Sequence, residues 1–402
     1  MKRTRTFIRE ERGAVLVQVG IAVLVLMAFN VFVLDFGMMW IARIQAQNAA
    51  DAGALAGAVA RAYDDRADPP HPADLAGEIT RRVARANLIW QQAGEPIVSF
   101  DCPVGVDANC TRVDVHRDGS NGSTALPSFF GPILGVNSQQ VRATATAVNG
   151  SGNMTPCIRP MAFADGWDER PPDDDNFDHY NFASPPVPLA AGSRDDYAAP
   201  NSTYPGRTTI SGDYGYRIVW DISVWTVIQA NQPITRRLMV PLDLPGVFAD
   251  TMTDCVGQPV RLGQTIPVDT GLHPADATDG INAVFAQDAS ADYDYGNSRI
   301  VNSCAPGCAA VSPRLIPIVL YDPRRFQYGQ RTGDWANAQA GCPDARPCVT
   351  VSNIVGFFIH RIGSGGGFGP HGHILRYPGA ITSTAPTYAD DGSWLVTTHL
   401  IR

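Results

Sequence analysis

The sequence predicts an α+β protein built on a single N-terminal transmembrane helix. Three observations lead to this fold class: one long apolar run near the N-terminus, an alanine-rich continuation behind it, and a turn-rich remainder that contains all eight cysteines. The chain has 38 glycines and 31 prolines among 402 residues, and only 17% of its residues are charged. That composition is more typical of a turn-rich β domain than of a helical one.

The apolar run covers residues 14–34 and contains no charged residue. Only Gln18 and Asn30 carry strongly polar side chains. A helix of this length spans roughly 30 Å, which is the hydrocarbon thickness of a bilayer. We therefore expect residues 1–13 to form a short N-terminal segment and residues 14–34 to form a membrane helix.

The charges on the two sides of this run predict its orientation. The first 34 residues carry five basic and two acidic side chains, so residues 35–402 account for a net charge of −11 within the total of −8. Because basic residues are retained in the cytoplasm, the N-terminus is expected inside and the remainder outside. An acidic exterior also argues against nucleic-acid binding.

A cleaved secretion signal is the alternative interpretation of this N-terminus. The small residues 54–56 (Ala-Leu-Ala) suit a cleavage site, but they lie about twenty residues beyond the apolar run. The run is also longer than the 7–15 residues that are usual for a signal core. These lengths favour an uncleaved anchor.

Cysteine usage independently places the second part of the chain in an oxidising compartment. All eight cysteines follow the membrane segment, and an even count of this kind predicts disulfides. Spacing favours three short pairs and one long-range pair, whereas a zinc site would need Cys-x-x-Cys spacing, which is absent. The expected pairs are Cys102–Cys110, Cys304–Cys308, Cys342–Cys348 and Cys157–Cys255.

Residues 35–65 are expected to continue the membrane helix, because alanine dominates and no proline occurs before Pro69. Gly53 and Gly57 lie one turn apart, with Ala46 and Ala50 at similar spacing. A face of such small residues permits close approach of a partner helix, although alanine-rich helices produce these patterns easily.

Residues 66–148 are expected to form a small α+β unit. Its elements would be a helix over 73–92, a hairpin of strands 97–100 and 111–117, and a closing strand over 139–148. The Cys102–Cys110 disulfide would link the two strands of the hairpin. Residues 149–402 are expected to form a mainly β, sandwich-like domain, with strands over 216–228, 237–244, 314–321, 353–362 and 394–402.

No stretch of the sequence indicates catalysis, a cofactor or a metal. Asp173, Asp174, Asp175 and Asp178 are interpreted as a solvated acidic loop, and so are Asp292 and Asp294. His371 and His373 could share a metal only with a third ligand that no spacing supplies. We find no nucleophile elbow, phosphate-binding loop or zinc-protease helix.

Several N-terminal motifs resemble those of a known family. They are Arg12-Gly13 before the apolar run, Asp35-Phe36-Gly37 after it, the segment 47–58 (QNAADAGALAGA), Phe129-Phe130-Gly131, Leu134-Gly135 and the strand 141–147. Together they resemble the N-terminal region of TadG-like proteins, which belong with the TadE/TadF/TadG pseudopilin-like components of the tight-adherence (Flp) pilus system. The resemblance covers roughly residues 10–150 and is strongest over 12–58.

This resemblance implies a bitopic, non-enzymatic pilus-assembly component in a bacterial inner membrane, with other Tad proteins as partners and its C-terminal domain in the periplasm. TadE-like members carry glutamate at the fifth position after the processed glycine, whereas Gln18 stands there in this chain. The difference argues against cleavage after Gly13 and against a role as a repeating filament subunit. The alternative function is a membrane-tethered periplasmic β domain that binds or hydrolyses a ligand.

Overall fold

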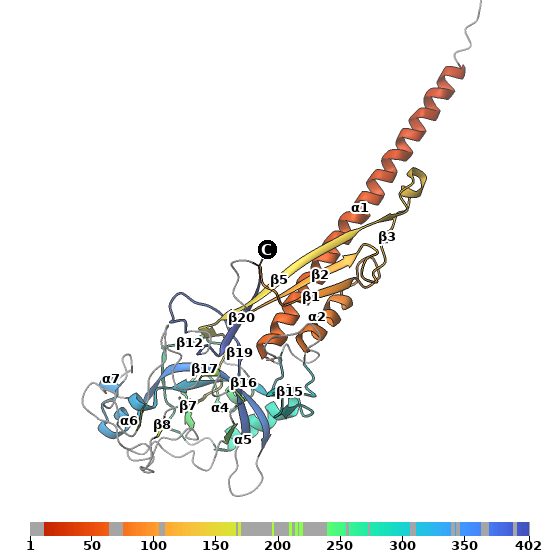
Figure 1. Ribbon diagram of the computed structural model, residues 1–402. Helices are drawn as coiled ribbons and strands as arrows, with labels where there is room; N and C mark the ends of the chain where they lie inside the picture. Colours follow the sequence, from red (N-terminus) through yellow and green to blue (C-terminus); the bar gives the residue numbers. More distant parts are fainter. Residues whose placement is uncertain are drawn as a thin grey trace, which may run out of the picture. The chain divides into compact units, whose positions relative to one another are not determined.

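The computed structural model confirms the α+β class, with one long N-terminal helix followed by mixed strands and helices (Figure 1). It separates into two compact units, each described here by itself. Unit 1 comprises Met1–Ala58, Pro69–Val148 and His399–Arg402, and unit 2 comprises Val59–Asp68 and Asn149–Thr398. The structure describes residues 12–63, 75–103, 109–165, 168–169, 195–196, 209–210, 214–215, 217–219, 239–254, 257–271, 274–305, 311–338, 342, 346–362, 370–388 and 392–401.

Helix α1 (Arg12–Tyr63) is one uninterrupted helix of 52 residues, as the absence of proline and the abundance of alanine predict. At 1.5 Å per residue it is about 78 Å long, more than twice what a membrane span requires. Its first part is exposed, and from Asp35 onward one side of it is buried. The apolar segment and the alanine-rich segment are thus two parts of the same helix.

In unit 1, α1 packs against helix α2 and against three neighbouring antiparallel strands of a five-stranded sheet. These elements are α2 (Leu75–Ala86), β1 (Glu95–Ser99), β2 (Cys110–Arg117) and β5 (Val141–Ser151). The predicted helix over 73–92 is shorter than expected, because residues 89–92 form a tight turn in which Ile89 and Gln92 exchange backbone hydrogen bonds. The predicted hairpin and closing strand are present.

Alternation along the strands builds the core of unit 1. Alternate residues of β2 and β5 face α1, where they meet the small side chains of the helix. This core comprises Ala42, Ala46, Ala49, Ala50, Ala54, Ala58, Ala84, Ile89, Val113, Val115, Leu126, Val141, Ala143, Ala145 and Ala147. Beyond the sheet, β3 (Leu126–Pro127) and β4 (Ser138–Gln139) pair with each other and support a short 3-10 helix, η1 (Gly131–Leu134).

Unit 2 is organised by one mixed sheet, in which the described strands run in the order β10-β18-β17-β16-β7-β11 with β13 also paired to β17. The pairing of β16 with β7 is parallel and the other pairings are antiparallel. The strands are β7 (Met161–Ala164), β10 (Arg217–Val219), β11 (Met239–Pro241), β13 (Thr265–Pro267), β16 (Leu315–Tyr321), β17 (Cys348–Ile362) and β18 (Pro370–Leu375).

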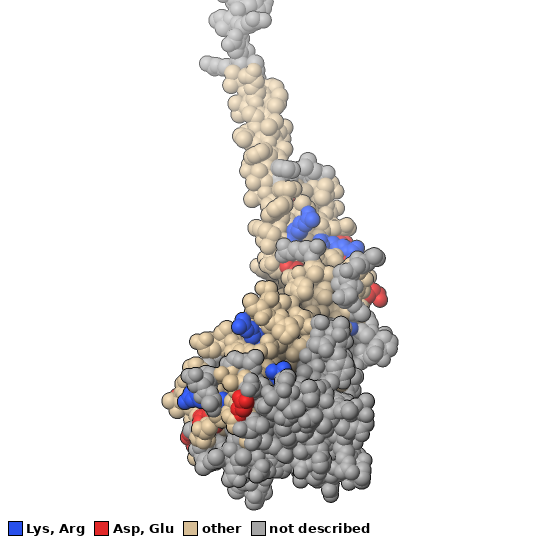
Figure 2. Space-filling view, turned by 90° about the vertical axis from the view of Figure 1, so that its left-hand side faces the viewer, with Lys and Arg blue, Asp and Glu red and all other residues tan. Residues whose placement is uncertain are grey.

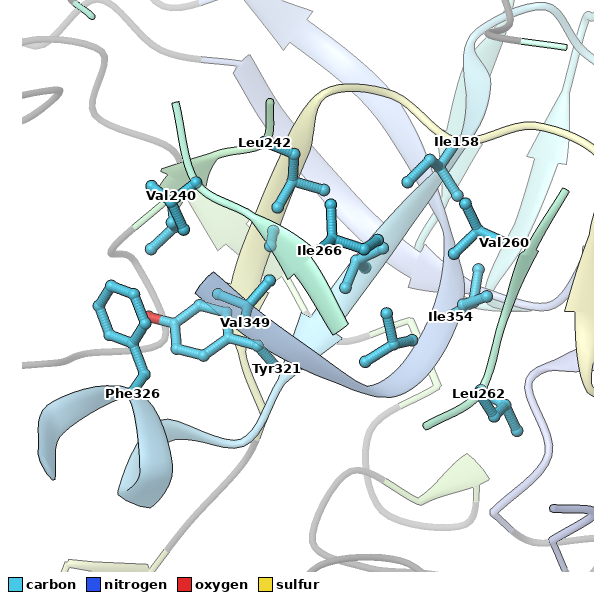
Figure 3. Packing of buried hydrophobic residues seen from close by; sticks show 14 of the residues in the cluster. Ile158, Val240, Leu242, Val260, Leu262, Ile266, Tyr321, Phe326, Val349 and Ile354 are labelled. Carbon is cyan, nitrogen blue, oxygen red and sulfur yellow. The ribbon is translucent and has the colours of Figure 1, made fainter. Parts of the chain in front are cut away.

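Two hydrophobic clusters contain the buried residues of this sheet. Different helices and strands pack against the sheet in each cluster. In the first, α4 (Phe248–Thr253) and α5 (Pro274–Gln287) contribute Phe248, Met252, Ala277, Ile281 and Val284. In the second, Val319, Tyr321 and Ile354 of β16 and β17 pack with Ile266 of β13 and with Phe326 of α6 (Pro323–Thr332) (Figure 3). Helices therefore form part of the core of unit 2.

This arrangement corrects the expectation of a sandwich-like domain. The described strands of unit 2 include one large sheet packed with helices and several two-stranded pairs, not two large facing sheets. Those pairs include β6 (Met154–Thr155) with β12 (Val260–Arg261), β8 (Asp168–Glu169) with β9 (Asp195–Asp196), and β14 (Asp292–Asp294) with β15 (Arg299–Val301). The remaining elements are α7 (Trp335–Ala338), β19 (Tyr377–Pro378) and β20 (Leu395–Ile401).

A buried polar network joins α5 to the sheet of unit 2. Asp288 accepts hydrogen bonds from the hydroxyls of Ser303 and Ser312, both at 2.6 Å, and from the backbone N–H of Cys304 at 2.9 Å. Arg314 is fully buried and donates to the carbonyls of Asp288, Ala291, Ile359 and His360. Burial alone raises the pKa of Asp288, but these hydrogen bonds and the charge of Arg314 outweigh it, so that the pKa lies below its ordinary value.

We expect Asp288→Asn to lower the free energy of unfolding by about 2 kcal/mol near pH 7, because the hydroxyl and N–H donors lose a charged acceptor. The pKa of Asp288 is lower in the folded state than in the unfolded state. The ionised carboxylate therefore stabilises the folded state at pH values above the unfolded-state pKa of about 4, and this stabilisation is lost as the pH falls below that value towards the folded-state pKa. The difference between the variant and the parent should therefore shrink below about pH 4. Thermal unfolding of the detergent-solubilised protein across this pH range measures it.

Asp243→Asn is the control, since the Asp243 side chain is 53% exposed. A difference for Asp288→Asn that does not change with pH would show that the carboxylate charge is not what stabilises the network.

Candidate functional site

The N-terminal part of α1 is the most apolar exposed surface of the described residues. Large side chains along it are 43–76% exposed, among them Leu16, Leu24 and Phe29. Asn30 donates its amide N–H to the carbonyl of Leu26 at 2.9 Å, so its polar group is satisfied within the helix. Figure 2 shows this stretch without charged side chains on the face in view. Among the described helices, this one is long and apolar enough to cross a membrane.

Asp35 marks the point where α1 becomes part of unit 1. It is the first charged residue after the apolar run and its side chain is buried, with 6% exposed. Its carboxylate accepts four hydrogen bonds from one segment of the chain: from the Ser128 hydroxyl at 2.6 Å and from the backbone N–H groups of Phe129, Phe130 and Gly131 at 3.0, 3.2 and 2.7 Å. Charged acceptors form the stronger class of hydrogen bond, so Asp35 fixes this loop to the helix.

The local sequence explains how the loop presents these donors. A Cβ at Gly131 would overlap the Ser128 hydroxyl and lie 2.5 Å from the carbonyl of Val136, so only glycine fits this position. Gly135 ends η1 with φ +82°, a conformation that favours glycine. The loop therefore closes on itself by backbone bonds from Gly135 to Pro132 and from Val136 to Gly131.

The small-residue face of α1 is occupied by the chain's own elements. A Cβ at Gly53 would lie 2.9 Å from Cβ of Ala84 in α2, and a Cβ at Gly57 would overlap the Thr80 hydroxyl and lie 2.7 Å from a methyl of Thr111. Ala46 and Ala50 are fully buried in the core of unit 1. The helix that this face accommodates is α2, and packing of Gly53, Gly57, Ala46 and Ala50 against another protein stays a prediction.

Two glutamines secure the edges of the same helix face. The side-chain oxygen of Gln45 accepts the backbone N–H of Trp90 at 2.8 Å. The Gln47 amide donates to the carbonyl of Thr144 in β5 at 3.2 Å and to the carboxylate of Asp51 at 2.8 Å. Polar side chains thus hold the helix against the turn and the sheet on either side of its alanine stripe.

A second stripe of α1 remains exposed beyond Asp35. Phe36, Trp40 and Ile44 follow one another at intervals of four residues and are 46%, 57% and 51% exposed. Ile41 beside them is 49% exposed. Residues at i, i+4 and i+8 share one side of a helix, so these side chains form an apolar stripe that extends the exposed apolar part of α1 into unit 1.

Two of the expected disulfides are present among the described residues. Cys102 and Cys110 are joined with their Cα atoms 5.6 Å apart, and Cys342 and Cys348 with theirs 5.9 Å apart, both ordinary separations for a disulfide. Cys157 and Cys304 are also disulfide-bonded. Their expected partners, Cys255 and Cys308, lie outside the described residues.

The histidines and acids considered from the sequence do not form a metal centre in the described part of the chain, where no group of three His, Cys, Asp or Glu side chains could hold one. His371 lies beside Arg361, while His373 stacks on Tyr293 with ring centroids 3.7 Å apart. Asp292 accepts from the His360 ring at 2.7 Å.

The turn after Asp292 is held by its own acid, since Asp294 accepts from the backbone N–H groups of Gly296 and Asn297. The acidic segment Asp173, Asp174, Asp175 and Asp178 lies outside the described residues.

These features define a protein with one N-terminal helix that could anchor it in a membrane, joined to a disulfide-containing α+β body. Residues 13–60 match the model of the family described as "Putative Flp pilus-assembly TadE/G-like". The matched segment contains the apolar run, Asp35 and the small-residue face. No curated protein and no solved structure showed significant similarity to the chain. The family match confirms the TadG-like resemblance of the N-terminal region.

We expect Gly57→Ala to destabilise unit 1 by about 1–3 kcal/mol, because the added methyl overlaps Thr80 and Thr111 in a close-packed contact. Gly37→Ala is the matched control in the same helix, since a Cβ there meets nothing within 4 Å. It should be neutral or slightly stabilising through helix propensity. Thermal unfolding in detergent compares the two, and equal effects would contradict the packing described.

Asp35→Asn should release the loop over 128–131, because a neutral amide oxygen is a weaker acceptor than the carboxylate and cannot hold four donors. We expect amide hydrogen exchange at Phe129, Phe130 and Gly131 to accelerate by about tenfold to a hundredfold, equivalent to about 1.4–2.8 kcal/mol.

Ser128→Ala, which removes one donor of the four, should give a smaller change at the same amides. Unchanged protection in Asp35→Asn would show that the loop is held by other contacts.

Proposed function

We propose that this protein is a membrane-anchored, non-enzymatic component of Flp/Tad pilus assembly. The observation that carries the proposal is the match of residues 13–60 to the TadE/G-like family, over the helix that is apolar enough to span a bilayer. In this proposal α1 crosses the inner membrane once, with the N-terminus in the cytoplasm and both units in the periplasm. The basic N-terminus and the disulfides support that orientation.

We assign contact with other assembly proteins to the exposed stripe of Phe36, Trp40 and Ile44. The opposite side of α1 is covered by α2 and β2 of the same chain, so its small residues already have a partner. The exposed stripe is continuous with the apolar part of α1, so another apolar helix in the same membrane could follow it. Arg43 is exposed on the same side of the helix, seven residues after Phe36, so its charge would lie at the edge of this contact.

The stripe is tested by Trp40→Glu combined with Ile44→Glu in a strain that assembles Flp pili. Charged side chains in an apolar helix contact are costly to bury, so we expect surface pilin in sheared fractions to fall by about tenfold or more. An immunoblot for pilin measures this outcome, and a second blot checks that the variant is present in the membrane at the parental level.

Leu88→Glu serves as the control, since Leu88 lies in unit 1 outside α1 and is 53% exposed. It should leave pilus assembly unchanged. Normal piliation by the double variant would refute the assignment of the stripe, and normal piliation after deletion of the whole gene would refute the assembly function.

A further inference from the structure

Asp35 holds the loop over residues 128–136, which we call the tip and which carries no charged residue. The tip lies beside the end of the apolar part of α1. Residues 119–141 form the longest run without a charged residue in the chain, 23 residues against 22 for residues 13–34. In the middle of this run, Phe129, Phe130 and Val136 are 63%, 37% and 50% exposed. A soluble protein surface rarely leaves such a segment free of charge, and exposed apolar patches of this kind mark interaction sites.

The hydrogen bonds of Asp35 set the depth of this tip. Asp35 directly follows the apolar run, so its carboxylate lies at the outer edge of the hydrocarbon when residues 14–34 span the bilayer. The donors of Ser128, Phe129, Phe130 and Gly131 lie within 3.4 Å of that carboxylate. The tip is therefore held beside the helix at the height of the lipid headgroups.

Most backbone N–H groups of the tip form hydrogen bonds within the protein, so they do not depend on water. The N–H groups of Phe129, Phe130 and Gly131 are bonded to Asp35, and those of residues 128, 135 and 136 are bonded to carbonyls within the loop. Pro132 has no N–H to satisfy. Unsatisfied backbone groups are what normally exclude irregular loops from the bilayer. Here six of the eight backbone N–H groups over residues 128–136 have an acceptor.

These observations indicate that the exposed apolar side chains of the tip contact lipid. We propose that the loop 128–136 inserts the side chains of Phe129, Phe130 and Val136 into the outer interface of the same bilayer that α1 spans, giving the protein a second contact with lipid. The contact rests on the proposed anchoring of α1. It restricts the orientation of unit 1 relative to the membrane plane, because unit 1 then contacts the bilayer at two points and not through α1 alone.

The test uses the full chain reconstituted in phosphatidylcholine–phosphatidylglycerol vesicles, with the photoreactive residue p-benzoyl-phenylalanine at position 130 or 136. Position 33 reports on the membrane helix, and position 97 is the matched exposed control. Ile97 is 41% exposed and pairs through β2 with Thr144, whose carbonyl binds Gln47 three turns beyond Asp35. After irradiation and proteolysis, mass spectrometry counts the peptides that carry lipid.

We expect lipid adducts at 130 and 136 to exceed those at 97 by about tenfold or more, in keeping with the partition of one buried apolar side chain. Asp35→Asn should reduce the adducts at 130 and 136 but not those at 33. Adducts at 33 without adducts at 130 and 136 would overturn the insertion and leave the anchor intact. Crosslinks from the tip to a second copy in place of lipid would also overturn it. Absence of adducts at 33 would overturn the anchor itself, and the insertion with it.

Discussion

The close contact of α1 with α2 and β2 is the constraint on which unit 1 depends. Gly53 and Gly57 have no side chains, so the backbones of the two helices approach to a distance that any larger residue would prevent. The alanines of the same face then fill the space above β2 and β5, where alternate valines and alanines meet them. The long apolar helix thus continues as the central element of unit 1 without interruption.

The sequence analysis predicted the long N-terminal apolar helix, its continuation to about residue 65, the hairpin with its disulfide and the TadG-like character of the N-terminal region. These features depend on local information: run length, proline positions, alternation and cysteine spacing. Helix α5 was missed because its sequence, PADATDGINAVFAQ, lies in a region rich in glycine and proline that suggested strands only. The described strands of unit 2 differ from the sandwich-like expectation for the same reason, since strand pattern alone does not show what packs with a sheet.

The Asp35 loop contact shows the other limit of sequence reasoning. Asp35-Phe36-Gly37 and Phe129-Phe130-Gly131 were both recognised as motifs, yet more than ninety residues separate them and nothing in either predicts that they meet. A charged residue next to a long apolar run requires compensation, but any backbone N–H group can supply it. The sequence therefore shows that Asp35 needs a partner and does not identify which segment provides it.

The final residues of β20 carry a consequence for how the protein is made. Residues 399–402 belong to unit 1, and Leu400 packs on the core that α1 begins, although the whole of unit 2 is synthesised between them. The elements α2, β2 and β5 can cover the alanine face of α1 early, because they follow it closely in the chain. The contact of Leu400 with the same core forms last, so the packing of unit 1 is complete only when nearly the whole chain has been synthesised.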